Sequence, residues 1–127
     1  MSRPSPDRLG RSDRELAAAR LLREGGFAAQ AVSRAYYAAF FAAEQVLLTL
    51  GETRTKHSGV IAAFNKLLVR EQGFDESGAR TLRRLFERRS DADYGGIEVT
   101  SDEAHAAIED AERFVQDVGR WLSARDR

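Results

Sequence analysis

Residues 27–50 read FAAQAVSRAYYAAFFAAEQVLLTL, and the rest of the chain is expected to fold around them. Only two charges, Arg34 and Glu44, interrupt a stretch that contains eight alanines. At about 1.5 Å per residue, an α-helix of this length is roughly 36 Å long. Because apolar residues cover nearly every side of it, we predict a central helix that other helices bury all round.

Glycines mark both ends of this predicted helix. Gly25 and Gly26 precede it and Gly51 follows it, which is typical of a helix start and of a C-terminal stop. A membrane span is the rival interpretation, and it needs about 20 mostly apolar residues in a row. The longest unbroken apolar run is residues 35–43, so we interpret the stretch as the centre of a soluble bundle with no membrane segment.

Composition narrows the classes of function. The 127 residues suit one domain, and the 43% that are apolar suffice for one core. Twenty basic and twenty acidic residues cancel, so nucleic-acid binding has to be judged from local patches of charge. The lack of cysteine excludes disulfides, thiolate metal sites and cysteine nucleophiles, and the two histidines are far apart in sequence. We therefore predict neither a metal nor a cofactor.

The beginning of the chain shows no signal-peptide pattern, so a cytoplasmic protein is expected. Residues 1–11 are polar and contain two prolines, and we interpret them as a disordered leader. Ser12 and Glu15 then form a capping-box pattern, in which each side chain satisfies a backbone N–H at a helix start. This pattern predicts a first helix over about residues 13–24.

Three more helices are expected after the central one, at about residues 57–72, 76–91 and 101–123. Asp75 is the predicted N-cap of the second of these, and Thr100 with Glu103 forms another capping box. No stretch alternates convincingly with period two, so no sheet is expected. Short loops favour antiparallel neighbours, and we predict an all-α, antiparallel up-and-down bundle of about five helices over residues 12–124.

The candidate site is the stretch LRRLFERRSDADY, residues 82–94. On a helical wheel Arg89 and Asp93 lie in the middle of the apolar face, whereas Arg88 lies toward the solvent edge. A charge on a buried face is costly unless it is paired, and Arg89 and Asp93 are an i, i+4 pair. Two interpretations stay open: an internal salt bridge that closes the helix end, or a polar site between helices or subunits.

Two further polar groups are candidates for ligand contacts. Five arginines lie between residues 80 and 89, Arg84 among them, and they form either a solvated face or a phosphate-binding surface. Ser33, Arg34 and Tyr37 form a polar stripe on the central helix. This stripe faces the same cleft as Arg89, or it hydrogen-bonds inside the bundle.

Three segments resemble the HEPN domain family. They are SRAYYAAFFAAEQVLL at residues 33–48, TKHSGV at residues 55–60 and RRSDADY at residues 88–94. With the helices around them, the resemblance extends over about residues 13–122. It implies an antiparallel helical bundle, usually dimeric, of the kind often encoded beside a minimal nucleotidyltransferase.

The active members of that family resemble metal-independent endoribonucleases. Their motif is an arginine followed, after four to six residues, by a histidine, and the site forms across the dimer. Carried over to this chain, the arginine falls on Arg88 or Arg89 and the histidine position on Asp93. A carboxylate paired with an arginine stays ionised and is a poor acid, so we expect any ribonuclease activity to be feeble. The chain resembles the branch of the family with an Arg…Asp-Tyr ending.

The resemblance also implies a role for Tyr94, since the partner nucleotidyltransferase of related toxin–antitoxin pairs adenylylates a tyrosine beside this motif. The alternative is an aromatic cap on the end of the bundle. The candidate catalytic residues are thus Arg88, Arg89 and Asp93. The candidate RNA- or nucleotide-binding residues are Arg34, Tyr37, Arg84 and Tyr94.

Three functions remain in competition. The first is a component of a two-component, toxin–antitoxin-like module that partners a minimal nucleotidyltransferase and binds RNA or a nucleotide. The second is a weak metal-independent endoribonuclease, and the third is a non-catalytic dimerisation or interaction module. In each case we expect a homodimer that buries part of the central or the fourth helix, because residues 27–50 are apolar on nearly all sides.

Overall fold

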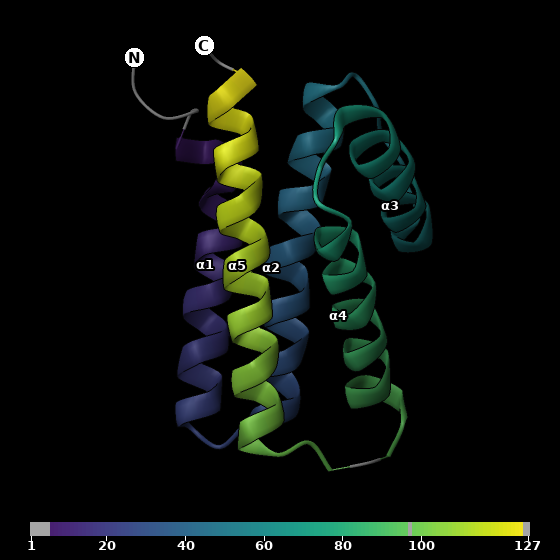
Figure 1. Cartoon of the computed structure of the whole chain (residues 1–127). Coiled ribbons are helices and arrows are strands. Elements are labelled where there is room, and N and C mark those ends of the chain that lie inside the picture. Colours follow the sequence, from purple (N-terminus) through teal and green to yellow (C-terminus); the bar gives the residue numbers. More distant parts are fainter. Residues whose placement is uncertain (1–5, 97, 126–127) are drawn as a thin grey trace.

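The structure, a computed structural model, describes residues 6–96 and 98–125 and contains five α-helices, one π-helix and no strand within them. The α-helices are α1 (Pro6–Glu24), α2 (Ala28–Thr49), α3 (His57–Phe64), α4 (Glu76–Tyr94) and α5 (Ser101–Arg125) (Figure 1). The π-helix η1 (Asn65–Glu71) continues α3. The predicted all-α class is therefore confirmed.

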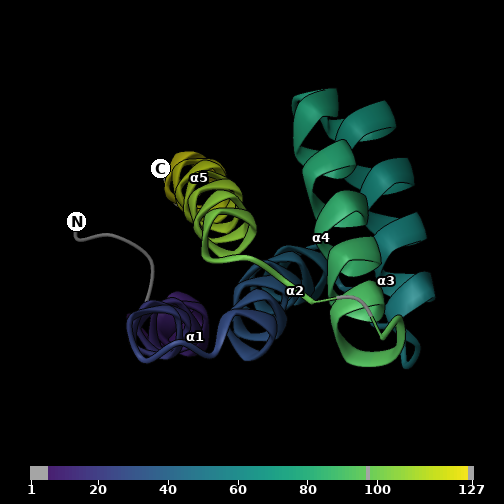
Figure 2. The ribbon, with the colours of Figure 1, turned by 90° about the horizontal axis from the view of Figure 1, so that it is seen from below.

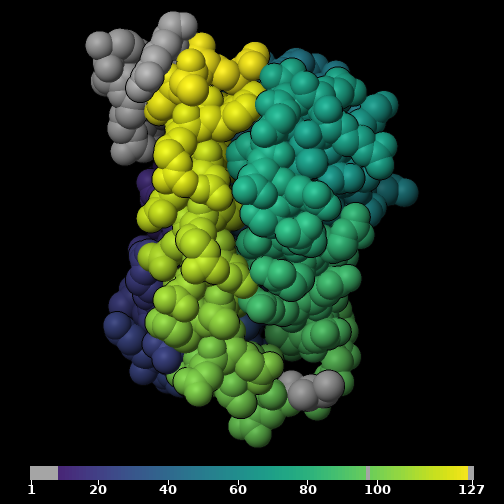
Figure 3. All heavy atoms as spheres, viewed as in Figure 1, coloured from purple at the N-terminus to yellow at the C-terminus, as the bar shows by residue number. Residues whose placement is uncertain are grey.

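The helix α2 lies at the centre of the bundle, where it packs against α1, α3, α4 and α5. The helices α1, α2, α4 and α5 alternate in direction, as an antiparallel bundle requires, while α3 lies beside α4 (Figures 1 and 2). In the space-filling view the lower half of α5 borders α4, and its upper half borders the segment that precedes α4 (Figure 3). No helix in the described part of the chain is long and apolar enough to cross a membrane.

Alanines explain how so many helices reach α2. Its fully buried alanines are Ala31, Ala35, Ala38, Ala39, Ala42 and Ala43. Because a methyl side chain is small, neighbouring backbones approach closely, and Tyr36, Val46 and Leu47 fill the space between them. One chain thus covers most of α2 by itself. The apolar surface from which we predicted a dimer is used within the monomer, and dimerisation stays a prediction.

Glycines lie at both ends of α2, as the sequence predicts. Gly26 before it has φ 89° and Gly51 after it has φ 76°, a left-handed conformation that glycine adopts at little cost. Beyond Gly51, the N–H of Glu52 donates to the carbonyl oxygen of Leu47 at 2.8 Å. This bond satisfies a carbonyl at the C-terminal end of the helix and turns the chain back along it.

The first helix begins earlier than predicted. It starts at Pro6, so residues 6–11 are helical rather than a disordered leader, while residues 1–5 lie outside the described part of the chain. Proline suits a first helical turn because its missing N–H would have no partner there. Ser12 is not an N-cap, since its buried hydroxyl donates to the carbonyl oxygen of Ala38 on α2 at 2.7 Å. The buried face of α1 runs through Leu9, Ser12, Leu16 and Ala19.

The predicted helix over residues 57–72 is present, but its hydrogen-bond pattern changes at Asn65 from α to π. A π-helix bonds five residues back instead of four, which widens the turn. The segment nonetheless buries Val60, Ile61, Phe64 and Leu68.

The predicted N-caps of α4 and α5 are confirmed. The Asp75 carboxylate accepts a hydrogen bond from the N–H of Ser77 at 2.8 Å. The N–H of Thr100 donates to Glu103 Oε1 at 3.0 Å, and the N–H of Glu103 donates back to Thr100 Oγ1 at 3.1 Å. These two caps fix where α4 and α5 begin, and hence where the candidate site on α4 lies.

Candidate functional site

The two neighbouring arginines of α4 point to different helices. Successive residues of an α-helix are rotated by about 100°, so Arg88 and Arg89 cannot serve the same cleft. Arg89 reaches α2, where it contacts Tyr37. Arg88 reaches α5, where it contacts Asp110. The candidate catalytic arginines therefore belong to two separate sites.

The first site, the Arg89 cluster, consists of Ser33, Tyr37, Arg89 and Asp93. The Nε of Arg89 lies 3.0 Å from Asp93 Oδ2, and an Arg89 Nη donates to the Tyr37 hydroxyl oxygen at 3.2 Å. The side chains of Arg89 and Asp93 are 18% and 29% exposed, so the predicted i, i+4 pair exists and lies at the edge of the core. It is an ion pair rather than a good hydrogen bond, because no acceptor among the described residues is aligned with the buried Nε–H.

Aromatic rings hold the Arg89 guanidinium in place. Its central carbon lies 5.8 Å from the ring centre of Tyr36 and 5.5 Å from that of Tyr37, within the range of cation–π attraction. The guanidinium of Arg34 also lies over the Tyr37 ring, with its central carbon 4.8 Å from the ring centre. Tyr37 thus joins two guanidinium groups that come from different helices.

The polar stripe of α2 is divided: part of it faces Arg89, and part of it pairs with another helix of the bundle. Tyr37 faces Arg89, and the Ser33 hydroxyl lies 3.5 Å from Asp93 Oδ1, at the limit of a hydrogen bond. Arg34 instead pairs with Glu15 of α1 at 3.0 Å, in a partly exposed contact between the two helices. Of the candidate ligand-binding residues on α2, Tyr37 joins the Arg89 cluster directly and Arg34 only through the Tyr37 ring.

His57 belongs to the same region, although we did not expect it at the site. Its Nδ1 lies 2.8 Å from the Tyr36 hydroxyl, and its ring stacks on Phe40 with the ring centres 4.2 Å apart. Its ring centre is 5.7 Å from that of Tyr37. The only signal in the sequence was that the segment 55–60 carries part of the family resemblance.

Two pKa shifts follow from this packing. Burial, and secondly the charge of Arg89, lowers the pKa of His57 below its usual 6.5, so the imidazole is neutral at neutral pH. Burial, and secondly Tyr37, raises the pKa of the Tyr36 hydroxyl well above its usual 10, so that hydroxyl keeps its proton.

The second site, the Asp110 cluster, consists of Arg84, Arg88, Asp110 and Arg113. Asp110 lies on α5 with a side chain only 12% exposed, and it accepts hydrogen bonds from Arg113 at 2.5 Å and Arg88 at 3.0 Å. Arg84 lies 3.8 Å from the same carboxylate. As expected, Arg88 lies toward the solvent edge, with 36% of its side chain exposed, and Arg84 is more than half exposed. The contacts with Asp110 connect both arginines to α5.

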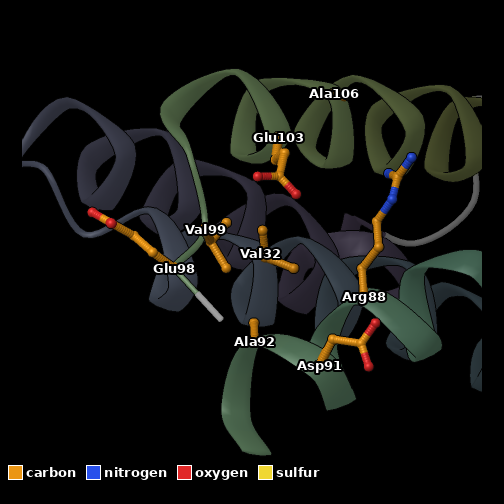
Figure 4. A pocket seen from close by; sticks show the side chains of 8 residues that line it. All are labelled: Val32, Arg88, Asp91, Ala92, Glu98, Val99, Glu103 and Ala106. Atoms are coloured by element: carbon orange, nitrogen blue, oxygen red, sulfur yellow. The ribbon is translucent and has the colours of Figure 1, made fainter. Parts of the chain in front are cut away.

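A pocket of about 280 Å³ opens beside Arg88, between α2, α4 and α5 (Figure 4). Val32, Ala92 and Val99 give it an apolar floor, and Glu103 extends from α5 toward it. The Glu103 carboxylate is already committed to its backbone cap at Thr100, which lowers its pKa. No group of three or more potential metal-ligating side chains occurs within the described ranges.

Tyr94 ends α4 with 79% of its surface exposed. An aromatic cap on the bundle end would be packed against other side chains, so that interpretation is wrong. The phenol is instead exposed to solvent, one residue after the carboxylate of the Arg89 cluster.

Comparison with known proteins gives consistent matches over most of the chain. The model of a family described as HEPN domain matches residues 5–121. A protein of Methanocaldococcus jannaschii whose name begins "Putative toxin" is 36% identical over 111 residues, covering 87% of this chain and 83% of that protein. A UPF0332 protein of Gloeobacter violaceus is 31% identical over 125 residues, covering 97% and 99% respectively. A UPF0332 protein of Thermotoga maritima is 34% identical over 93 residues, covering 72% and 70%.

Proposed function

This chain belongs to the HEPN domain family, and from that premise we propose that it is a toxin-like component of a two-component module. In this proposal it partners a minimal nucleotidyltransferase and binds RNA or a nucleotide. The observation that carries the proposal is the Arg89 cluster, in which a half-buried guanidinium is held between tyrosine rings at the edge of the bundle. Two relatives whose names begin "Putative toxin" support the toxin-like assignment.

Arginines next to aromatic rings suit single-stranded RNA. Bases stack on exposed aromatic and guanidinium planes, and the phosphates attract positive charge. The Arg89 cluster offers Tyr37 and Arg89 on one side of α4. On the other side, the Asp110 cluster holds three arginines around one carboxylate, which leaves a local excess of positive charge. The positive charge of the Asp110 cluster favours a phosphate-bearing ligand, and the Arg89 cluster adds an aromatic ring and a guanidinium plane.

A weak, metal-independent ribonuclease activity is the second candidate. The geometry favours Arg89 over Arg88 for it, because Arg89 lies beside Asp93 and Arg88 is engaged by Asp110. Attack by a ribose 2′-hydroxyl needs a base for its proton and an acid for the leaving oxygen, and such catalysis is worth about 10²–10⁴-fold. Asp93 is ion-paired and does neither well, so cleavage is expected to be slow.

A labelled single-stranded RNA in the presence of a chelator distinguishes the candidates. We expect wild type to bind and scarcely cleave, Arg89→Ala to bind less, and a folded Asp93→His variant to cleave faster. Rapid, chelator-resistant cleavage by wild type that Arg89→Ala abolishes would make the protein an enzyme and reverse the ranking. Absence of RNA binding by wild type would leave the non-catalytic interaction module.

Tyr94 is the proposed target of the partner. Its phenol oxygen would attack the α-phosphorus of ATP in the partner's site, releasing pyrophosphate, while the phenolic proton passes to a base of the partner or to water. Its 79% exposure allows such access. Mass spectrometry after incubation with the partner and ATP should find one added adenylyl group on Tyr94 and none on Tyr94→Phe, whereas modification of the half-buried Tyr37 instead would refute the assignment.

Homodimerisation is the remaining part of the proposal. It no longer rests on α2, which the chain itself covers, but on the family and on exposed apolar side chains such as Phe27 and Leu48. Sedimentation at micromolar concentration measures it directly. A strict monomer would remove the dimer from the proposal and leave the ligand surfaces untouched.

A further inference from the structure

The connection between α2 and α3 brings a histidine into the Arg89 region. His57 begins α3, yet its ring contacts Tyr36, Tyr37 and Phe40 in the middle of α2. The Phe40 ring stacks on one face of the imidazole, and the Tyr36 hydroxyl forms a hydrogen bond with its Nδ1.

The hydrogen bond to Tyr36 determines which nitrogen carries the proton. The Tyr36 side chain is fully buried, and its hydroxyl has no other partner than His57 among the described residues. A buried O–H must donate, so it donates to Nδ1, which has to be unprotonated. In a neutral imidazole the proton then sits on Nε2.

The Nε2–H points away from Tyr36, because the two nitrogens of an imidazole lie on opposite sides of the ring carbon between them. His57 is only partly buried, and its Nε2 lies at the surface of the described part of the chain. The Arg89 guanidinium is close enough to disfavour a second positive charge on this ring. The exposed edge of His57 is thus a neutral hydrogen-bond donor beside a cation.

We propose that His57 is an RNA-binding residue, whose Nε2–H donates to a phosphodiester oxygen of single-stranded RNA held beside Arg89. The inference rests on the RNA binding proposed above and names a contact within it. Tyr37 completes the donor set, because its oxygen accepts from Arg89 and its own O–H is left to donate. Asp93, the carboxylate of the cluster, is neutralised by Arg89.

Two substitutions separate this role from the support of Tyr36. In His57→Asn the side-chain amide takes the place of Nδ1 and can still accept from Tyr36, but nothing replaces the Nε2–H. In His57→Gln the amide reaches the Nε2 position and can donate to RNA, but the partner of Tyr36 is lost. The first variant should fold well and bind RNA about 10- to 100-fold more weakly, as expected for a lost bond to a charged group. The second should be less stable but bind RNA more tightly than the first.

The matched control is His105, the other of the two histidines, which pairs with Glu109 on the exposed side of α5. His105→Ala should leave the affinity unchanged. With two imidazoles in the chain, NMR resolves each one, and the long-range ¹⁵N pattern should show His57 protonated on Nε2. Addition of a short single-stranded RNA should shift the His57 signals and leave those of His105 in place.

Each outcome decides something. If wild type does not bind the RNA by fluorescence anisotropy, the proposed function fails and this inference with it. If wild type binds while the His57 signals stay unmoved, or if His57→Asn binds as tightly as wild type, this inference alone is overturned. An Nε2 without a proton in the unbound protein would refute the tautomer argument.

Discussion

Removal of the buried carboxylate Asp110 is the strongest test of the interface between α4 and α5. Its side chain is 12% exposed, and it accepts two hydrogen bonds from guanidinium groups at 2.5 and 3.0 Å. Breaking a fully buried ion pair costs about 3–5 kcal/mol, because the remaining charge is left without a partner. Here Arg84 and Arg113 are more than half exposed and can turn to water, so we expect Asp110→Ala to cost only about 2 kcal/mol.

Thermal unfolding followed by circular dichroism measures this cost. For a domain of this size, about 2 kcal/mol corresponds to a fall in Tm of roughly 6–10 °C. The control is Asp117→Ala, which removes the same residue type from the same helix but from an exposed pair with Arg120. That change should cost under about 1 kcal/mol. Equal and small effects of the two substitutions would refute the view that Asp110 organises the α4–α5 interface.

Three further predictions concern the remaining polar contacts. Arg89→Ala and Asp93→Ala should each destabilise the protein by about 1–3 kcal/mol in urea, since their pair lies between the exposed and buried limits, while the exposed Arg83→Ala should cost under about 0.5 kcal/mol. Burial and the charge of Arg89 lower the pKa of His57, so the unfolded chain binds the proton more readily than the folded protein. The contribution of His57 to stability is therefore complete above about pH 6.5 and falls as the pH drops toward the pKa of the folded protein. Urea midpoints from about pH 7.5 to pH 5 should show this slope in wild type and a smaller one in His57→Asn. Ser12→Ala should lower the free energy of unfolding by about 1 kcal/mol, because it removes the buried hydrogen bond to α2. In an isolated peptide covering α1 the same change should leave the helicity unchanged, whereas loss of an N-cap would reduce it.

The sequence was sufficient for several features that depend on neighbours along the chain. The central helix was predictable because residues 27–50 are apolar on nearly every side and glycines flank the stretch. The caps at Asp75 and Thr100 were also predictable, since each joins a side chain to a backbone N–H two or three residues away. The pair of Arg89 and Asp93 is of the same kind, because i, i+4 residues on a helix are neighbours whatever surrounds them.

The tertiary structure decided what depends on contacts between helices. The Ser12 hydroxyl serves a carbonyl of α2 instead of its own helix, a choice that the pattern Ser12…Glu15 cannot reveal. Asp110 could not be recognised as a buried partner of Arg88, because the two residues meet only through the way α4 packs on α5. His57 is not among the candidate site residues chosen from the sequence, and the path of the chain after α2 places it against Tyr36 and Tyr37. Side-chain periodicity is local, whereas the packing of helices that places these groups together is set by the whole core at once.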